Sequence, residues 1–97
     1  MTATRAGTAH MADEAEAVRD FLISELYWQG PRSELTDELP LIANRVIDSM
    51  GLLRLVAWIE TQFAITIDDT EVVPANFGTI QGVAALIRGK EKQPSGR

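Results

Sequence analysis

The chain has 97 residues, 45% of them hydrophobic, and a formal net charge of −5, so it is long enough for one small domain and too short for two. It contains no Cys, which excludes disulfides, thiolate metal sites and cysteine nucleophiles. Its one His, at position 10, leaves little from which to build a multi-His metal site or a Ser-His-Asp triad. The composition therefore disfavours a conventional enzyme and a metal site, and we expect no functional role for His10.

Acidic residues are concentrated in the middle of the chain. Residues 34–71 contain eight acids and two bases, whereas residues 72–97 contain one acid and four bases. This block disfavours binding to nucleic acid and favours a basic protein partner, although solvation of surface helices also accounts for it. No segment resembles a signal peptide or a membrane span, so we expect a cytoplasmic chain with no membrane contact.

Apolar residues at helical spacing predict a first helix from Asp13 to Trp28. Asp13 is a suitable N-cap, and Gly30-Pro31 ends the helix. Residues 1–12 are then a flexible tail. The aromatic side chains near the end of this helix, Tyr27 and Trp28, are expected to pack over an edge of the core. The repeating apolar positions are Ala15, Val18, Leu22 and Leu26, with Phe21 beside them, and Glu14, Arg19, Asp20 and Glu25 lie at the polar positions.

A long connection follows, at residues 29–47. It contains too many apolar residues for a disordered linker, namely Leu35, Leu39, Leu41, Ile42, Val46 and Ile47. A connection of this length without regular structure is often functional. We expect one helical turn from Leu35 to Leu39, with the remainder folding across the core.

The second helix is predicted from Ser49 to Phe63, and it has two apolar faces. The first is a core stripe of Leu52, Leu55, Val56, Ile59 and Phe63. The second is a patch of Met50, Leu53 and Ala57. A helix needs only one apolar face to fold, so the patch indicates contact with a partner, although one or two exposed hydrophobic residues are normal. Trp58 lies off the core stripe and is expected to cover the loop or to contact cargo.

Short elements are predicted between the second helix and the last one. Residues 64–67 alternate in a way that allows a brief extended segment, and residues 68–71 form a turn or a helix start. Residues 74–77 form one helical turn with Pro near its first position. Thr79 caps a final helix that Gly89 ends, and residues 89–97 are a flexible tail. The expected fold is a small all-α four-helix bundle, with its domain at residues 13–88 and a long loop between its first two helices.

The dipeptide Asp48-Ser49 stands at the start of the second helix, directly before the exposed patch. Taken alone it indicates ordinary N-capping, in which either side chain accepts a backbone N–H. The segment 46–56 (VIDSMGLLRLV), however, resembles the attachment motif of the acyl, aminoacyl and peptidyl carrier proteins. The resemblance extends through residues 59–63 and 65–69 to Thr79 and the last helix, and it covers about residues 13–88.

The resemblance implies that Ser49 carries a 4′-phosphopantetheine arm, transferred from coenzyme A by a separate phosphopantetheinyl transferase. Ser49 would then be a modification site, with Asp48 helping to position the transferase. Met50, Leu53 and Ala57 match the family's recognition face. These are the same three residues that helical geometry marks as the surplus patch. The family's partners are the transferase, an adenylating ligase or acyltransferase, and downstream synthase or tailoring enzymes.

Arg54 departs from the family pattern, in which an acid is common at this position. It is expected to lie in solvent or to pair with Glu60 or a loop acid, and to meet an acidic or neutral contact on the partner. Arg54, Gly51 and the segment 74–79 (PANFGT) resemble free-standing aminoacyl carriers more than fatty-acid or polyketide acyl carriers. We therefore favour an aminoacyl or peptidyl carrier over an acyl carrier, and we expect the chain to be monomeric and non-catalytic. The alternative is an unmodified helical interaction module in which Ser49 only caps the helix.

Overall fold

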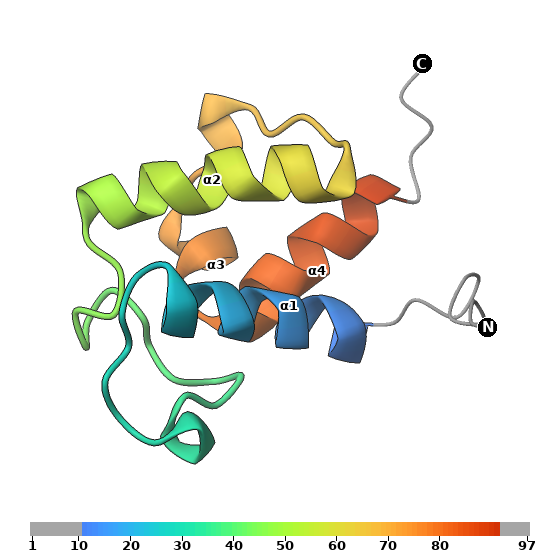
Figure 1. The fold of residues 1–97 in the computed structure, drawn as a ribbon. Helices are drawn as coiled ribbons and strands as arrows, with labels where there is room; N and C mark the ends of the chain where they lie inside the picture. Colours follow the sequence, from blue (N-terminus) through green and yellow to red (C-terminus); the bar gives the residue numbers. More distant parts are fainter. Residues whose placement is uncertain (1–10, 92–97) are drawn as a thin grey trace, which may run out of the picture.

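The computed structural model describes residues 11–91, and within that range the fold is all-α with no β-strand. Its helices are α1 (Met11–Ser24), α2 (Ser49–Phe63), α3 (Pro74–Phe77) and α4 (Ile80–Glu91), with 3₁₀ turns at Arg32–Glu34 (η2) and Asp69–Glu71 (η3). Figure 1 shows α1 and α2 running in opposite directions, with α3 and α4 beneath α2 and the long connection looping out at one end. The predicted fold class is confirmed, and none of these helices is long and apolar enough to cross a membrane. His10 and the outer parts of the predicted tails, residues 1–10 and 92–97, lie outside the described residues.

The core lies between α1 and α4, with α2 across it. Burying apolar side chains of this kind is the main favourable contribution to folding, at about 25 cal/mol per Å². Thr79 caps α4 as predicted, because its hydroxyl accepts a hydrogen bond from the Gly82 amide at 3.0 Å. α4 continues past Gly89 to Glu91, two residues beyond the predicted end. The largest fully buried side chains are Phe77, Leu22, Leu35, Leu41, Leu55, Ile59, Ile80, Ile87, Val18 and Val83.

The bounds predicted for the first helix were wrong at both ends. α1 already includes Met11, so Asp13 lies inside the helix and is not its N-cap. The helix ends at Ser24 because Tyr27 adopts a left-handed backbone, with φ at 59°. The chain then folds back, and the Trp28 amide donates to the Leu22 carbonyl at 3.1 Å. Tyr27 is 72% exposed and covers no core edge, whereas Trp28 packs against the core as predicted.

The connection between α1 and α2 is attached to the α3–α4 turn. The Leu41 amide donates to the Gly78 carbonyl at 2.7 Å, and the Gln81 amide donates to the Asp37 carbonyl at 2.9 Å. Leu35 and Leu41 are fully buried, which confirms that the connection folds across the core. The helical turn lies at Arg32–Glu34 instead of the predicted 35–39. The leucines therefore anchor irregular backbone and do not form one face of a turn.

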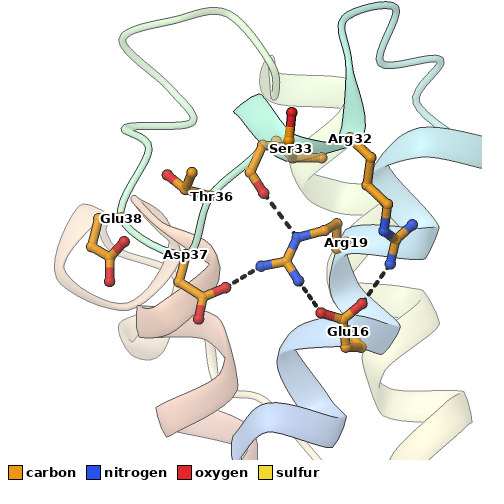
Figure 2. A pocket seen from close by; sticks show the side chains of 8 residues that line it. Glu16, Arg19, Arg32, Ser33, Thr36, Asp37 and Glu38 are labelled. Carbon is orange, nitrogen blue, oxygen red and sulfur yellow. Dashed lines mark hydrogen bonds and ion pairs between the residues drawn. The ribbon is translucent and has the colours of Figure 1, made fainter.

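Two charged residues of α1 are buried, although the sequence indicated a polar, solvated position for each. Arg19 is 8% exposed and donates from Nε to the Leu35 carbonyl at 2.8 Å. Figure 2 shows its guanidinium between the carboxylates of Glu16 and Asp37, with both of which it forms ion pairs. Arg19 thus fastens the connection to α1. The second residue, Glu14, is 2% exposed.

Candidate functional site

At the start of α2, Asp48 caps the helix and Ser49 presents an exposed hydroxyl. Asp48 is the N-cap, with extended backbone (φ −108°, ψ −173°), and its carboxylate accepts from the Gly51 amide at 2.8 Å. Ser49 is the first residue of the helix, and its side chain is exposed. Within residues 11–91 its hydroxyl makes no hydrogen bond. The reading in which Ser49 caps the helix is therefore wrong, because Asp48 makes that bond.

The position of Ser49 suits a covalently attached anion. Backbone N–H groups in the first turn of a helix are unsatisfied and carry partial positive charge. The first turn of α2 contains no acidic residue, and the one carboxylate at the helix start, that of Asp48, accepts from the Gly51 amide. A phosphate at this surface site would be stabilised by about 0.3–1 kcal/mol. The residues present at the start of α2 thus fit a phosphate-linked group on Ser49.

The first turn of α2 packs closely on the segment after α1. Gly51 is buried, and a Cβ at this position would lie 3.2 Å from Asp48 Oδ1 and 3.3 Å from Leu26 Cδ1. A larger residue would crowd both the capping carboxylate and the leucine. Gly51 therefore lets α2 begin against the body of the protein while Ser49 faces outward.

The two apolar faces of α2 lie as predicted. Leu55 and Ile59 are fully buried, whereas Leu52, Val56 and Phe63 are half-buried against the core. On the other face Met50 is 67% exposed and Leu53 63% exposed, and Ala57 is exposed as well. We call Met50, Leu53 and Ala57 the apolar patch. It begins one residue after Ser49, so a protein that reaches the Ser49 hydroxyl meets this patch at once.

Arg54 lies on the exposed side of α2 and pairs with Glu25, at 3.3 Å between Nη2 and Oε1. Of the two kinds of partner expected, the loop acid is the one observed, because Glu25 lies just after the end of α1. Glu60 is not used, since its carboxylate accepts from the Ile67 amide at 2.8 Å. Because both partners are about half exposed, the pair contributes at most about 1 kcal/mol to stability. Arg54 thus keeps its positive charge at the surface, beside the apolar patch.

Several acids of the middle block are occupied by contacts within the chain. Glu71 accepts from the Asp68 amide and pairs with Lys90 at 2.8 Å. The Lys90 ammonium, together with the Asp68 amide, lowers the pKa of Glu71 below its ordinary value. Asp37 pairs with Arg19 and Asp48 caps α2. These acids stabilise loops and helix starts, so the acidic block is not simply a free docking surface for a basic partner.

Trp58 is half-buried and packs against the core. Its ring stacks on Phe21 with the centroids 4.8 Å apart and meets the Phe63 ring edge-on at 5.8 Å. Such aromatic pairs stabilise the fold by about 0.5–1.5 kcal/mol each beyond the area they bury. Trp58 therefore packs between α1 and the end of α2, and its contact with cargo stays a prediction.

A groove of about 600 Å³ opens beside Ser49 and was not predicted from the sequence. Its polar wall includes Arg45, which is exposed and has φ at 59°. The sequence signal was weak, because Arg45 lies in an irregular connection of mostly apolar residues and no motif marks it. The groove is lined by Ile42, Ala43, Arg45, Ile47, Asp48, Ser49 and Leu52.

Comparison with known proteins gives consistent results. A family model described as phosphopantetheine attachment site matches residues 16–87, a range that contains Ser49 and all of α2. The probable acyl carrier protein PigG of Serratia sp. (strain ATCC 39006) is 28% identical over 72 residues, which cover 74% of this chain and 83% of PigG. The solved apo structure of KstB-PCP has a TM-score of 0.69 and 30% sequence identity, covering 88% of this chain and 92% of that one.

Proposed function

The chain belongs to the phosphopantetheine-attachment family of carrier proteins, and from this premise we propose that Ser49 is its attachment residue and that its cargo is aminoacyl or peptidyl. The cofactor of the family is a covalently attached 4′-phosphopantetheine group. The observation that supports Ser49 is its exposed hydroxyl on the first residue of α2, with the capping bond made by Asp48. This arrangement leaves the Ser49 oxygen available for a bond to phosphorus.

The chain contributes an attachment point and a docking face, and the bond-making chemistry comes from partner enzymes. Residues 11–91 contain no His, so the base that accepts the hydroxyl proton is assigned to the transferase. The Ser49 Oγ–phosphorus bond forms as the pyrophosphate linkage of coenzyme A breaks and adenosine 3′,5′-bisphosphate leaves. When attached, the group supplies the terminal thiol that this Cys-free chain lacks, and tethering raises the effective concentration of cargo at a partner's active site.

The aminoacyl or peptidyl subclass is supported by sequence and by fold. KstB-PCP, a peptidyl carrier protein by its name, shares 30% identity across 88% of this chain. Gly51, Arg54 and the segment 74–79 resemble aminoacyl carriers. The name of PigG points instead to an acyl carrier, at 28% identity. An adenylating ligase that loads an amino acid is accordingly the proposed loading partner, with an acyl-loading enzyme as the alternative.

The partner surface is proposed to combine the apolar patch with Arg54. Exposed Met50 and Leu53 offer adaptable apolar contacts next to the attachment residue. Arg54 adds a positive charge beside them, and its ion pair with Glu25 is exposed enough for a partner to displace. A partner with an apolar hollow and an acidic or neutral rim fits this surface.

Intact mass spectrometry tests the attachment site. The protein is incubated with coenzyme A and a promiscuous phosphopantetheinyl transferase. A mass gain of one arm is expected for the wild type and for Ser33→Ala, an exposed serine in the connection, and none for Ser49→Ala. No gain with several transferases would contradict the proposal and favour an unmodified interaction module. Loading of the modified protein by amino-acid and acyl ligases then decides the subclass.

A further inference from the structure

The groove beside Ser49 brings together one basic side chain and an apolar wall. Arg45 lies on the turn that precedes α2, and Ser49 is the first residue of that helix, so both line the same groove. Ile42, which is 45% exposed, and half-buried Leu52 supply apolar surface there. The groove therefore offers a cation and an apolar wall to whatever is attached at Ser49.

Arg45 differs from the other arginines of the described chain in having no partner. Arg19, Arg32 and Arg54 each pair with a carboxylate, and Arg88 also has an interaction. Within residues 11–91 the Arg45 guanidinium makes neither an ion pair nor a hydrogen bond. An unpaired guanidinium is a strong binder of phosphate, because its planar donors match the phosphate oxygens.

The backbone of Arg45 supports the same view. Its φ of 59° lies in the left-handed region that glycine adopts without strain and that other residues rarely enter. Its amide still donates to the Ile42 carbonyl at 3.1 Å, and the turn continues with the Val46 amide bonded to the Leu41 carbonyl at 2.8 Å. The turn would accept glycine easily, yet the chain places a long cationic side chain there. Strain of this kind is often found at functional positions.

We propose that Arg45 binds the phosphodiester formed at Ser49 and that Ile42 and Leu52 contact the geminal dimethyl group that follows it in the arm. The inference rests on Ser49 being the attachment residue. The phosphate is tethered to the groove's own wall, where Arg45 also lies, so pairing needs no movement of the helix. Asp48 also lines the groove, but its Oδ1 accepts from the Gly51 amide and it forms no ion pair with Arg45 within residues 11–91. The inner part of the arm is thus held against the protein while the thiol end stays free.

NMR of the modified protein tests this proposal. The arm is labelled with ¹⁵N by modification with labelled coenzyme A, and the heteronuclear NOE of its two amides is measured. The amide nearer the phosphate is expected to give the higher NOE in the wild type. Arg45→Gln and Arg45→Gly are expected to lower that NOE to the value of the outer amide. Arg45→Gly keeps the turn, because glycine adopts a positive φ.

Controls separate this inference from the attachment itself. Arg45→Lys keeps the charge and is expected to retain part of the NOE, and 1 M NaCl is expected to reduce the wild-type value. Arg54→Gln removes the same charge from the exposed side of α2 and is expected to leave the NOE unchanged. Equal NOE values in wild type and Arg45→Gln, or an equal loss in Arg54→Gln, would overturn the proposal. The mass gain reports attachment independently of the NOE. A protein that gains the arm but shows a mobile inner amide would therefore contradict the role of Arg45 and leave the attachment at Ser49 standing.

Discussion

The Asp48 carboxylate accepts a hydrogen bond from the Gly51 amide at 2.8 Å, which fixes the helix start at Ser49, the proposed attachment residue. Asp48 therefore has a structural role as the N-cap and a proposed role in positioning the transferase. Asp48→Ala is expected to lower the free energy of unfolding by about 1 kcal/mol, because a helix N–H loses its acceptor. Asp48→Asn is expected to keep nearly all of that stability, because Asn caps equally well.

The same pair of variants tests recognition by the transferase. The transferase is expected to recognise the negative charge of Asp48. Asp48→Asn should then slow the attachment of the arm to Ser49 about tenfold, while the urea midpoint of the variant stays near that of the wild type. Initial rates are followed by intact mass at fixed coenzyme A and transferase concentrations. If Asp48→Asn is modified at the wild-type rate, Asp48 has no role in transferase recognition and acts only as the N-cap of α2.

Arg19 is expected to control how firmly the connection is attached to α1. Arg19→Met keeps the apolar stem but leaves the Leu35 carbonyl without its donor and Glu16 and Asp37 without their cation. The free energy of unfolding should fall by about 1–3 kcal/mol, and amide exchange in residues 32–39 should become faster. Arg32→Met is the control, because its ion pairs are exposed and screened by solvent, so a smaller loss is expected. Equal losses in the two variants would contradict a special role for Arg19.

A glycine substitution is expected to stabilise the protein at the end of α2. Ala64 terminates the helix in the left-handed region, at φ 56° and ψ 47°. Ala64→Gly removes that strain and should raise the free energy of unfolding by about 0.5–1 kcal/mol. Ala85→Gly, at an exposed position inside α4, should lower it by about the same amount because its backbone is helical. Chemical denaturation of both variants checks the opposite signs.

Elements defined by local signals were predictable from the sequence. α2 begins and ends at the predicted residues, because Asp48 caps it and an apolar stripe runs along its whole length. α3 and the start of α4 also follow from neighbouring residues, namely Pro74 and Thr79. The apolar patch was predicted for the same reason, since it lies on that one well-defined helix, whereas Ser49 was proposed from the resemblance of residues 46–56 to the attachment motif.

The parts that were missed depend on contacts distant in sequence or on unusual backbone angles. The left-handed backbone of Tyr27 ends α1, but neither its residue type nor the continuing apolar spacing signals it. Arg19 looked solvated because its acceptors, the Leu35 carbonyl and Asp37, lie 16 and 18 residues away. Arg45 was missed for both reasons together, because its φ is positive and its groove forms only when the connection folds against α2.

Arg54 is expected to be recognised by the loading ligase. Arg54→Glu should reduce kcat/KM for loading by the cognate adenylating ligase about tenfold. The reason is that the new carboxylate would face a contact on the ligase that is expected to be acidic or neutral. The new carboxylate at position 54 would also repel Glu25, which should lower the free energy of unfolding by less than about 1 kcal/mol. The double variant Arg54→Glu/Glu25→Arg restores the ion pair but not the surface charge, so it should recover stability without recovering loading. An Arg54→Glu protein that improved every partner reaction would count against selective recognition.

Glu14 is expected to make the stability of the protein depend on pH. Its side chain is almost fully buried at the start of α1, and as an ionised carboxylate it has no hydrogen-bond partner among residues 11–91. Burial, together with a hydrogen bond and charge repulsion from Glu91, raises the pKa of Glu14 to about 7. Asp13 raises this pKa further, whereas Arg88 lowers it. A proton on Glu14 lets it donate to Glu91 and removes the buried charge.

The sign of the effect follows from the raised pKa. Between about pH 4.5 and 7 the folded state holds a proton that the unfolded state has lost, so stability falls as the pH rises and levels off above pH 7. Glu14→Gln removes this loss, because its amide donates to Glu91 at every pH. Urea denaturation should show the variant up to about 3 kcal/mol more stable than the wild type at pH 8, with the difference nearly gone at pH 4.5. Exposed Glu34→Gln is the control, and a constant difference at both pH values would contradict the titration of Glu14.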